Sequence, residues 1–349
     1  MKTQNHTQIF KRVLLACFAV LTSCTVDTDK DIDPNLNLKN NNECVSVMVS
    51  DADINSFYDS NVNIPRPEDT HLKALLHYNI NVSDFAASKK FYKLLAFANF
   101  IDLNIDVTDP DEAQGLDLPP YSLKTTPMRA KDGFIIDLIK FNSPYDGEAP
   151  HSDYNSIGFS SLHLKSSNLK KDRAYLARNG VSSTVIVGTE DTPEKIQFAD
   201  PDGTTILMSQ VGPVSNVYFF QRTKIDGVFS TNINVTDLAT SVDFYQEVGF
   251  ELVDQNEDYA TIALSKGRHI TLTESCSPNM AYEKVNHLGI ARIAITTSDL
   301  EADMEILSAK GIEFYSPVPI QGTGVFSIIR YAAFEDPDGN VLELVKLPL

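Results

Sequence analysis

Several kinds of residue and motif are scarce or missing in this chain of 349 residues, and each absence excludes a class of protein. Four cysteines are too few for a disulfide-stabilised scaffold. Basic residues are in the minority, and 29 of them against 47 acidic residues give a formal net charge of −18. This charge argues against a nucleic-acid partner, whose phosphates would be repelled. No nucleophile–base triad, phosphate-binding loop or CxxC pair is visible.

The N-terminal region lacks an apolar run long enough to span a bilayer. Residues 13–23 are apolar and follow a basic segment, which is the arrangement of a signal peptide. They end in Leu-Thr-Ser before Cys24, a sequence that resembles the lipobox of bacterial lipoproteins. The resemblance implies removal of residues 1–23 and lipidation of Cys24, which would anchor the protein in the cell envelope, facing the periplasm or the surface. An ordinary secretory signal that happens to contain Cys24 is the alternative.

Residues 24–72 are predicted to be an acidic tether and a lead-in segment. The stretch 25–43 is rich in Asp, Asn and Lys and has few large apolar residues. Such a stretch cannot bury enough apolar surface to offset the entropy lost on ordering.

The rest of the chain is built from repeats. Residues 79–88 read NINVSDFAAS, and residues 232–241 read NINVTDLATS; each is followed by a Phe-Tyr pair. A second pair of units interleaves with the first, and each of its members contains the tetrapeptide Asp-Pro-Asp-Gly, at 200–203 and at 336–339. The order of units is A, B, A′, B′, which indicates a duplicated architecture.

Each unit has the pattern of one strand, one helix and then three strands. Apolar and polar residues alternate along the first strand, and an Asp or Asn at the helix N-cap follows. Helices are predicted near 84–96, 168–179, 237–248 and 299–310. The Asp-Pro-Asp-Gly sequences have the chemistry of turns, because Pro fixes φ and Gly tolerates positive φ. The predicted fold class is therefore α+β, with four βαβββ modules.

This module resembles the vicinal oxygen chelate superfamily, which includes glyoxalase I, extradiol dioxygenases and bleomycin-resistance proteins. The resemblance covers about residues 75–347. It rests on the Asn-Val-Ser-Asp segment with its Phe-Tyr pair, and on the segment 336–344, which reads DPDGNVLEL. It implies two glyoxalase-like half-barrel domains, at 73–212 and 227–349, joined by a connector at 213–226.

The resemblance also implies where a metal site would lie. In metal-dependent members, two modules line a cavity, and the ligands come from the first and last strands of each module, because residues two apart on a strand face the same side. His77 of unit A and Glu343 of unit B′ match these positions, and Asp137 of unit A is a plausible substitute. The remaining equivalent positions hold Ser161, Leu207, Ser230, Thr271 and Arg292.

No two consecutive modules hold a full ligand set. If the first module pairs with the last, as in some relatives with four modules, His77, Asp137, Arg292 and Glu343 share one cavity. Iron, zinc, manganese or nickel would suit such ligands. Arg292 could instead bind an anionic substrate, or pair with Glu343 and close the site. His163 lies two residues after Ser161 and is expected to hydrogen-bond within a cavity or contact substrate.

Two functions follow from these expectations. The first is an exported, lipid-anchored lyase, isomerase or dioxygenase that acts on a small oxygen-rich molecule, assisted by a divalent metal in an incomplete ligand set. The alternative is a metal-free protein that binds or sequesters a small molecule, like the bleomycin-resistance members. The two are distinguished by whether the side chains at the ligand positions converge on one cavity.

Overall fold

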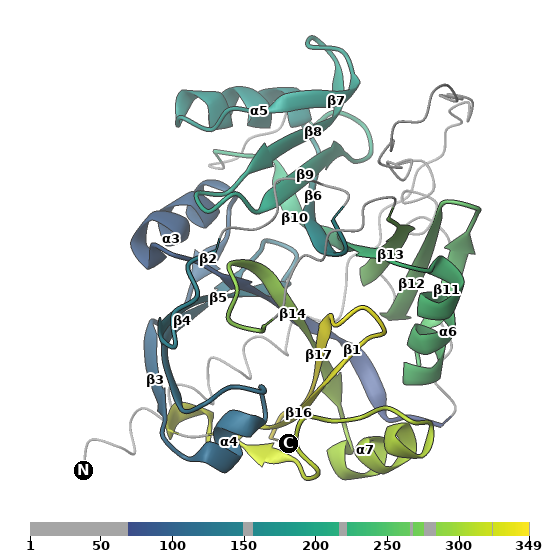
Figure 1. Ribbon diagram of the computed structural model, residues 1–349. Helices are drawn as coiled ribbons and strands as arrows, with labels where there is room; N and C mark the ends of the chain where they lie inside the picture. The colour runs from purple at the N-terminus through teal and green to yellow at the C-terminus, as the bar shows by residue number, and fades with distance from the viewer. Residues whose placement is uncertain are drawn as a thin grey trace.

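The computed structural model describes residues 69–148, 156–215, 222–265, 268–275, 284–322 and 324–348. The predicted signal peptide, Cys24 and the acidic tether lie outside the described residues. Within these ranges, no helix is long and apolar enough to cross a membrane. The described chain is α+β and forms two large sheets, with helices around the periphery of the molecule (Figure 1).

The four repeated units are visible as four modules, each of which begins with a long strand and a helix. Module A contains β1 (Leu72–Asn81), α3 (Phe85–Leu94), β2 (Ala98–Asn99), β3 (Leu103–Val107), α4 (Pro110–Gln114), β4 (Tyr121–Arg129) and β5 (Ile135–Ser143). Module B contains β6 (Gly158–Ser166), α5 (Leu169–Arg178), β7 (Thr184–Gly188), β8 (Pro193–Ala199) and β9 (Thr205–Gln210). The short helix α4 is specific to module A and was not expected.

The second half of the chain repeats this order. Module A′ contains β10 (Ile225–Val235), α6 (Leu238–Val248), β11 (Glu251–Gln255), β12 (Tyr259–Ser265) and β13 (Arg268–Glu274). Module B′ contains β14 (Gly289–Thr297), α7 (Leu300–Ala309), β15 (Ile320–Gln321), the 3₁₀ turn η1 (Gly324–Phe326), β16 (Arg330–Glu335) and β17 (Val341–Lys346). The predicted fold class and the four βαβββ modules are confirmed.

The four predicted helices begin where capping chemistry places them. The side chains of Asp84, Asn168, Asp237 and Asp299 each accept at least one backbone N–H from the first turn of their helices. These bonds satisfy donors that have no partner within the helix. Gly180 and Gly311 follow two of the helices with positive φ, a conformation that glycine adopts readily at the end of a helix.

The modules pair in a different order from their order along the chain. The strands of one sheet lie in the order β15-β16-β17-β14-β1-β5-β4-β2, with β3 paired to β4, so this sheet joins module A to module B′. The other sheet has the order β11-β12-β13-β10-β6-β9-β8-β7 and joins module A′ to module B. At the two seams, β1 pairs with β14 and β10 pairs with β6, both antiparallel. A division into consecutive domains 73–212 and 227–349 therefore does not coincide with the two sheets.

Consecutive modules are linked instead by the repeated motifs. The Tyr92 hydroxyl of module A donates to Asp200 of module B at 3.0 Å, and the Tyr245 hydroxyl of module A′ donates to Asp336 of module B′ at 2.9 Å. The backbone N–H of Ser83 likewise donates to Asp202 of module B. The tyrosine of each Phe-Tyr pair thus contacts the Asp-Pro-Asp-Gly turn of the next module. This contact occurs once in each half of the chain.

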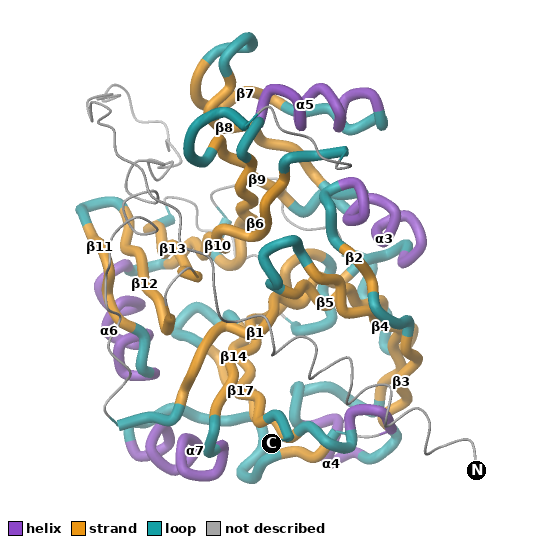
Figure 2. Tube along the Cα trace, turned by 180° about the vertical axis from the view of Figure 1, so that it is seen from behind, coloured by secondary structure: helices purple, strands orange, loops and turns teal. Residues whose placement is uncertain are grey.

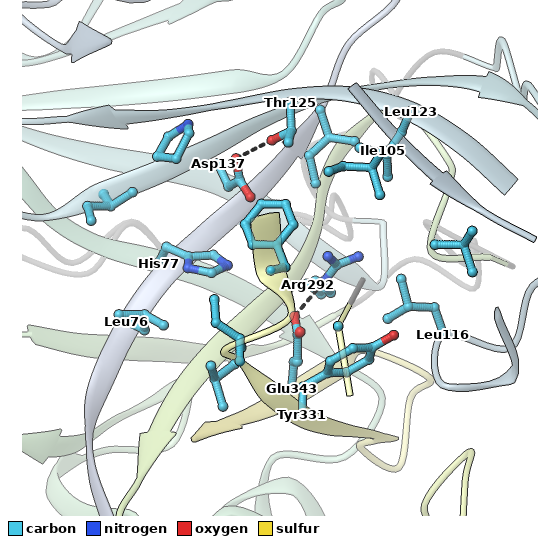
Figure 3. A pocket seen from close by; sticks show the side chains of 18 of the residues that line it. Leu76, His77, Ile105, Leu116, Leu123, Thr125, Asp137, Arg292, Tyr331 and Glu343 are labelled. Carbon is cyan, nitrogen blue, oxygen red and sulfur yellow. Dashed lines mark hydrogen bonds and ion pairs between the residues drawn. The ribbon is translucent and has the colours of Figure 1, made fainter. Parts of the chain in front are cut away.

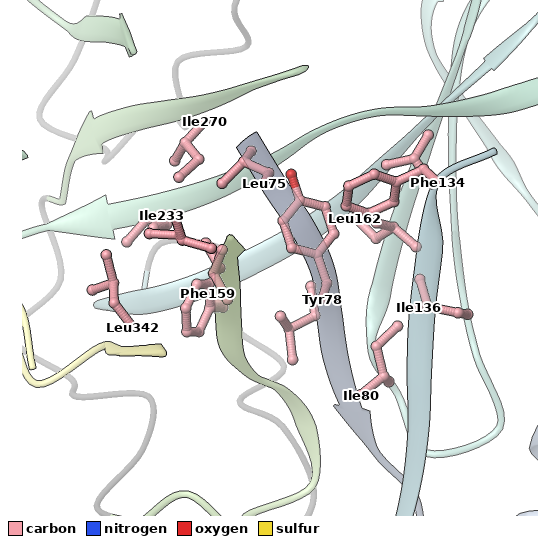
Figure 4. Packing of buried hydrophobic residues seen from close by; sticks show 14 of the residues in the cluster. Leu75, Tyr78, Ile80, Phe134, Ile136, Phe159, Leu162, Ile233, Ile270 and Leu342 are labelled. Carbon is pink, nitrogen blue, oxygen red and sulfur yellow. The ribbon is translucent and has the colours of Figure 1, made fainter. Parts of the chain in front are cut away.

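A single apolar core lies between the two sheets and under the helices. It contains buried side chains of β1, such as Leu75, Tyr78 and Ile80, and of β6, such as Leu162 (Figure 4). Seen from behind, the strands β1, β14 and β17 of one sheet lie below β6, β9 and β10 of the other (Figure 2). A smaller apolar cluster, which includes Leu123, lies on the opposite side of the first sheet. That side carries the candidate site.

Candidate functional site

The first sheet encloses a cavity of about 190 Å³ on the side facing away from the main core. His77, Asp137, Arg292 and Glu343 all line it (Figure 3). They come from β1, β5, β14 and β17, which are four adjacent strands at the centre of the sheet. The pairing of the first module with the last thus brings together the four residues that the sequence places at ligand positions.

The register of the strands explains this convergence. His77 pairs across the sheet with Ala294, and Ala294 pairs with Glu343 on its other side. Two residues further along β1, Asn79 pairs with both Asp137 and Arg292. These two sets of paired residues are separated by two positions along β1, so the four side chains share one face of the sheet and reach the same cavity.

Arg292 and Glu343 form a buried ion pair on the cavity floor. The Nε atom of Arg292 donates to Oε2 of Glu343 at 2.8 Å, and both side chains are at least nine-tenths buried. Burial, the largest single influence, opposes the charged guanidinium, but the interactions with Glu343, Tyr121 and Asp137 together outweigh it and raise the pKa of Arg292 above its ordinary value. The Nη1 atom of Arg292 is also buried and has no hydrogen-bond partner among the described residues.

His77 and Asp137 are half-buried beside this pair. Burial lowers the pKa of His77, which favours the neutral imidazole, although Asp137 and Glu343 oppose the shift. Burial raises the pKa of the Asp137 carboxyl, and its interactions with His77 and with the Thr125 hydroxyl, which donates to it, oppose that shift. The cavity floor therefore combines one ion pair with two groups that burial drives toward their neutral forms.

The walls of the cavity are mostly apolar. Leu76, Ile105, Leu123 and Ile139 are among the lining side chains. Two tyrosines, Tyr121 and Tyr331, also contribute, and burial raises the pKa of Tyr121 to about 12, so its hydroxyl stays protonated.

Sequence reasoning missed Tyr121, Thr125 and Tyr331, because it did not identify β4 or β16 as strands. The alternation of Tyr121, Leu123 and Thr125 along one face of β4 is the signal that would have found two of them.

The residues do not fit a metal in this arrangement. The described residues contain no group of three or more His, Cys, Asp or Glu side chains placed to hold a metal ion. The position of one expected ligand is taken by Arg292, whose guanidinium has no acceptor and cannot coordinate a cation. It also binds the Glu343 carboxylate, which would be a ligand in the metal-dependent pattern. A metal ion bound by Glu343 would lie close to the positively charged guanidinium of Arg292.

The second candidate for substrate contact, His163, lies elsewhere. It belongs to β6 in the other sheet, is 2% exposed, and its Nε2 atom hydrogen-bonds to the Ser209 hydroxyl at 2.7 Å. The Phe229 ring packs against it, with ring centroids 5.0 Å apart. Burial lowers the pKa of His163 well below its ordinary value. Its hydrogen bond with Ser209 is the kind of contact expected for a histidine on this face of the sheet.

Comparisons with known proteins agree with this architecture. Residues 227–344 match the family model described as Glyoxalase/Bleomycin resistance protein/Dioxygenase superfamily. No curated protein matches the chain. Glyoxalase I from Zea mays is similar in structure, with a TM-score of 0.56 and 19% identity over 78% of this chain and 92% of that one. A putative dioxygenase from Bacillus subtilis subsp. subtilis str. 168 has a TM-score of 0.59 and 14% identity, over 80% of this chain and 87% of that one.

At these identities the solved structures establish the fold, whereas the match to the family model is confined to modules A′ and B′. Residues 227–344 therefore carry the match to the glyoxalase, bleomycin resistance protein and dioxygenase superfamily, and the chain as a whole shares the fold of the solved structures named above.

Proposed function

We propose that this protein binds a small, mostly apolar molecule with one oxygen-bearing end in the cavity between modules A and B′, without a metal. The observation that carries the proposal is the Arg292–Glu343 ion pair at two of the family's ligand positions. The same arginine has a buried Nη1 donor without a described partner. A buried donor of this kind costs free energy until an acceptor reaches it, so a ligand oxygen would be stabilised there.

The charges of the floor indicate which oxygen is preferred. Glu343 already balances the charge of Arg292, and burial favours the neutral form of Asp137. A ligand that brings a full negative charge would gain from Arg292 but would be repelled by Glu343. A carbonyl or hydroxyl oxygen avoids that repulsion. The apolar walls suit the rest of the molecule, since burying it contributes about 25 cal/mol per Å².

Naphthalene and 2-acetonaphthone form a suitable pair of probes, because they share the ring system and only one has a carbonyl oxygen. By titration calorimetry, we expect the ketone to bind at least about tenfold more tightly, the value of one hydrogen bond to a charged donor. Arg292→Gln should remove this preference. Ser161→Ala, at the equivalent position of the other sheet, should leave it unchanged. A Leu123→Trp variant should lose both probes because its side chain fills the cavity. Equal binding of the two probes by the native protein would refute the proposal.

A second candidate function is supported by one observation. His77, Asp137 and Glu343 line a single cavity, as a metal-assisted lyase, isomerase or dioxygenase would require. Metal content of the purified protein separates the two functions. Stoichiometric iron, zinc, manganese or nickel that is lost in the His77→Ala variant would favour the metalloenzyme and overturn the metal-free site. Metal below one-tenth of an equivalent, unchanged by His77→Ala, would support the binding protein.

We also propose that the protein is exported and anchored to the cell envelope through a lipid on Cys24. The support is the lipobox-like sequence after a basic and apolar leader, followed by an acidic stretch suited to a tether. Cys24→Ser should release the protein from the membrane fraction. Retention of the variant in that fraction, or a mature N-terminus other than residue 24 in the native protein, would contradict this proposal.

A further inference from the structure

A groove with the opposite charge to the rest of the protein lies on the outer surface, away from the cavity. It lies between α3 of module A and α5 of module B, which are neighbours in both views (Figures 1 and 2), and its volume is about 670 Å³. Eleven described residues line it; five of them are basic and none is acidic, namely Lys89, Lys90, Lys93, Lys131 and Arg222 among Ala86, Leu94, Ala96, Tyr175, Thr223 and Ile225. In the whole chain, acidic residues outnumber basic ones by 47 to 29, so this concentration departs from the chain's own composition.

Only part of this positive charge is neutralised by the protein. Lys89 pairs with Asp102 at 2.6 Å, and Lys131 pairs with Asp226. The other three cations, Lys90, Lys93 and Arg222, are exposed and form no ion pair with another described residue. The groove thus keeps three positive charges that face solvent within a protein of net charge −18.

The placement of these cations indicates the shape of the ligand. Lys90 and Lys93 lie on α3, whereas Lys131 and Arg222 lie on two other segments, the turn after β4 and the lead-in to β10. A single anionic group would meet one wall, and a molecule with two or more anionic groups would meet both. Tyr175 of α5 also lines the groove, is half-buried and offers an aromatic surface for the uncharged part of such a ligand.

We propose that this groove binds a molecule that carries at least two phosphate or sulfate groups, at a site separate from the apolar cavity. Two sources share this chemistry: the headgroup of an anionic lipid, and a soluble polyphosphate. Charge complementarity concentrated in a groove raises local anion concentration and is screened by salt, with a Debye length of about 10 Å at 0.1 M. Binding should therefore weaken steeply as sodium chloride is added.

The test uses the purified full-length protein and inorganic tripolyphosphate in a calorimetric titration at low salt. Lys90→Glu with Lys93→Glu should weaken binding by about tenfold or more, as expected when two nearby attractions of about 1 kcal/mol each are reversed. The matched control is Lys170→Glu with Arg178→Glu on α5, which makes the same change of net charge at exposed positions outside the groove. The control should weaken binding by less than about threefold, as expected for a change in long-range charge alone.

A second double variant, Lys131→Gln with Arg222→Gln, changes the other wall and should also weaken binding. It tests the proposal independently if the α3 variant does not fold.

Vesicles of phosphatidylglycerol, with phosphatidylcholine vesicles as reference, distinguish the sources. Comparing native protein with the α3 variant cancels any contribution of an anchor. A native preference for phosphatidylglycerol that the variant loses assigns a lipid headgroup, and tripolyphosphate binding without that preference assigns a soluble ligand. Absence of tripolyphosphate binding, or equal weakening in the α5 control, would overturn the proposal.

Discussion

The two sheets share one scaffold but differ at every position where the family places a ligand. In the first sheet these positions hold His77, Asp137, Arg292 and Glu343, and the side chains surround a cavity. In the second sheet the equivalent residues are Ser230, Thr271, Ser161 and Leu207, which are all buried.

The second sheet fills its corresponding face with rings. Phe229 takes the place of Leu76 in the repeat and contacts the rings of His163 and His269, with centroids 5.0 and 5.5 Å away. Burial lowers the pKa of both imidazoles, that of His269 to about 3, so both are neutral at physiological pH. The duplicated architecture therefore stabilises two half-barrels, and among the described residues it is the first that has a cavity with a charged floor at these positions.

This difference shows that the scaffold does not depend on the site. The contacts between consecutive modules are made twice with nearly the same geometry, by Tyr92 with Asp200 and by Tyr245 with Asp336. The charged cavity floor, with its Arg292–Glu343 ion pair, belongs to the first sheet. We expect changes to the module contacts to act alike in both halves, and changes at the ligand positions to act in one half only.

The largest effect is expected at the buried ion pair. Arg292→Ala should lower the free energy of unfolding by about 3–5 kcal/mol, because it leaves the Glu343 carboxylate buried without its partner. Urea denaturation measures this change. Ser161→Ala, at the equivalent position of the second sheet, should change stability by less than about 0.5 kcal/mol, since its buried hydroxyl has no hydrogen-bond partner among the described residues.

The double variant Arg292→Ala with Glu343→Ala serves as the control. It should recover much of the loss, because the uncompensated charge is gone. If the single variant were as stable as the double variant, the pair would not be buried as described, and the contrast between the two sheets would fail.

The next effect concerns pH and should be shared by both halves. Burial raises the pKa of Asp200 and of Asp336 to about 6, from an ordinary value of 3.8. The native state then holds these protons more tightly than the unfolded state. Their contribution to stability is present below pH 4 and is lost as the pH rises through about 6, and it amounts to about 3 kcal/mol for each carboxyl.

Asp200→Asn and Asp336→Asn should each remove one half of this pH dependence in unfolding experiments between pH 4 and pH 8. A profile that flattens in one variant only would mean that the two module contacts differ, against their matching geometry.

A smaller effect is expected from the tyrosines of the same contacts. Tyr92→Phe and Tyr245→Phe each leave a buried carboxyl group with one hydrogen bond fewer, at a cost of about 1–3 kcal/mol. The two values should agree within about 0.5 kcal/mol, because the sites are distant and equivalent. Thermal unfolding of both variants under one set of conditions provides the comparison. Unequal losses of stability would show in which half of the chain the tyrosine hydrogen bond contributes less.

Much of the fold could be predicted from local sequence. The caps at Asp84, Asp237 and Asp299 place helices to within about two residues, since a side-chain acceptor at the first turn is a local requirement. The pairing of β1 with β14 has no local signal, because residues more than 200 positions apart meet there. Sequence patterns alone therefore left the pairing of the first module with the last as one alternative among others.

The site was predictable in its members but not in its contacts. The resemblance to the vicinal oxygen chelate superfamily pointed to His77 and Glu343, and strand alternation explains why the residues at such positions share a face. Whether Arg292 would turn toward Glu343 or toward a ligand depends on side-chain rotamers and burial, which spacing does not specify. In the structure Nε of Arg292 binds Glu343, and its Nη1 atom has no described partner.

The smallest effect compares two buried threonines, one in each sheet. Thr125 donates its hydroxyl hydrogen to Asp137, whereas the Thr271 hydroxyl is buried without a hydrogen-bond partner among the described residues. Valine has nearly the same shape as threonine, so each substitution by valine changes little besides the hydroxyl group. Thr271→Val should stabilise the protein by about 0.5–1 kcal/mol, because an unsatisfied polar group is removed from the interior. Thr125→Val should destabilise it by about 1 kcal/mol, because a carboxyl oxygen loses its donor. Opposite signs in urea denaturation would confirm that Thr125 makes a polar contact and Thr271 makes none, and a loss of stability in Thr271→Val would reveal a polar contact of Thr271 in the second sheet.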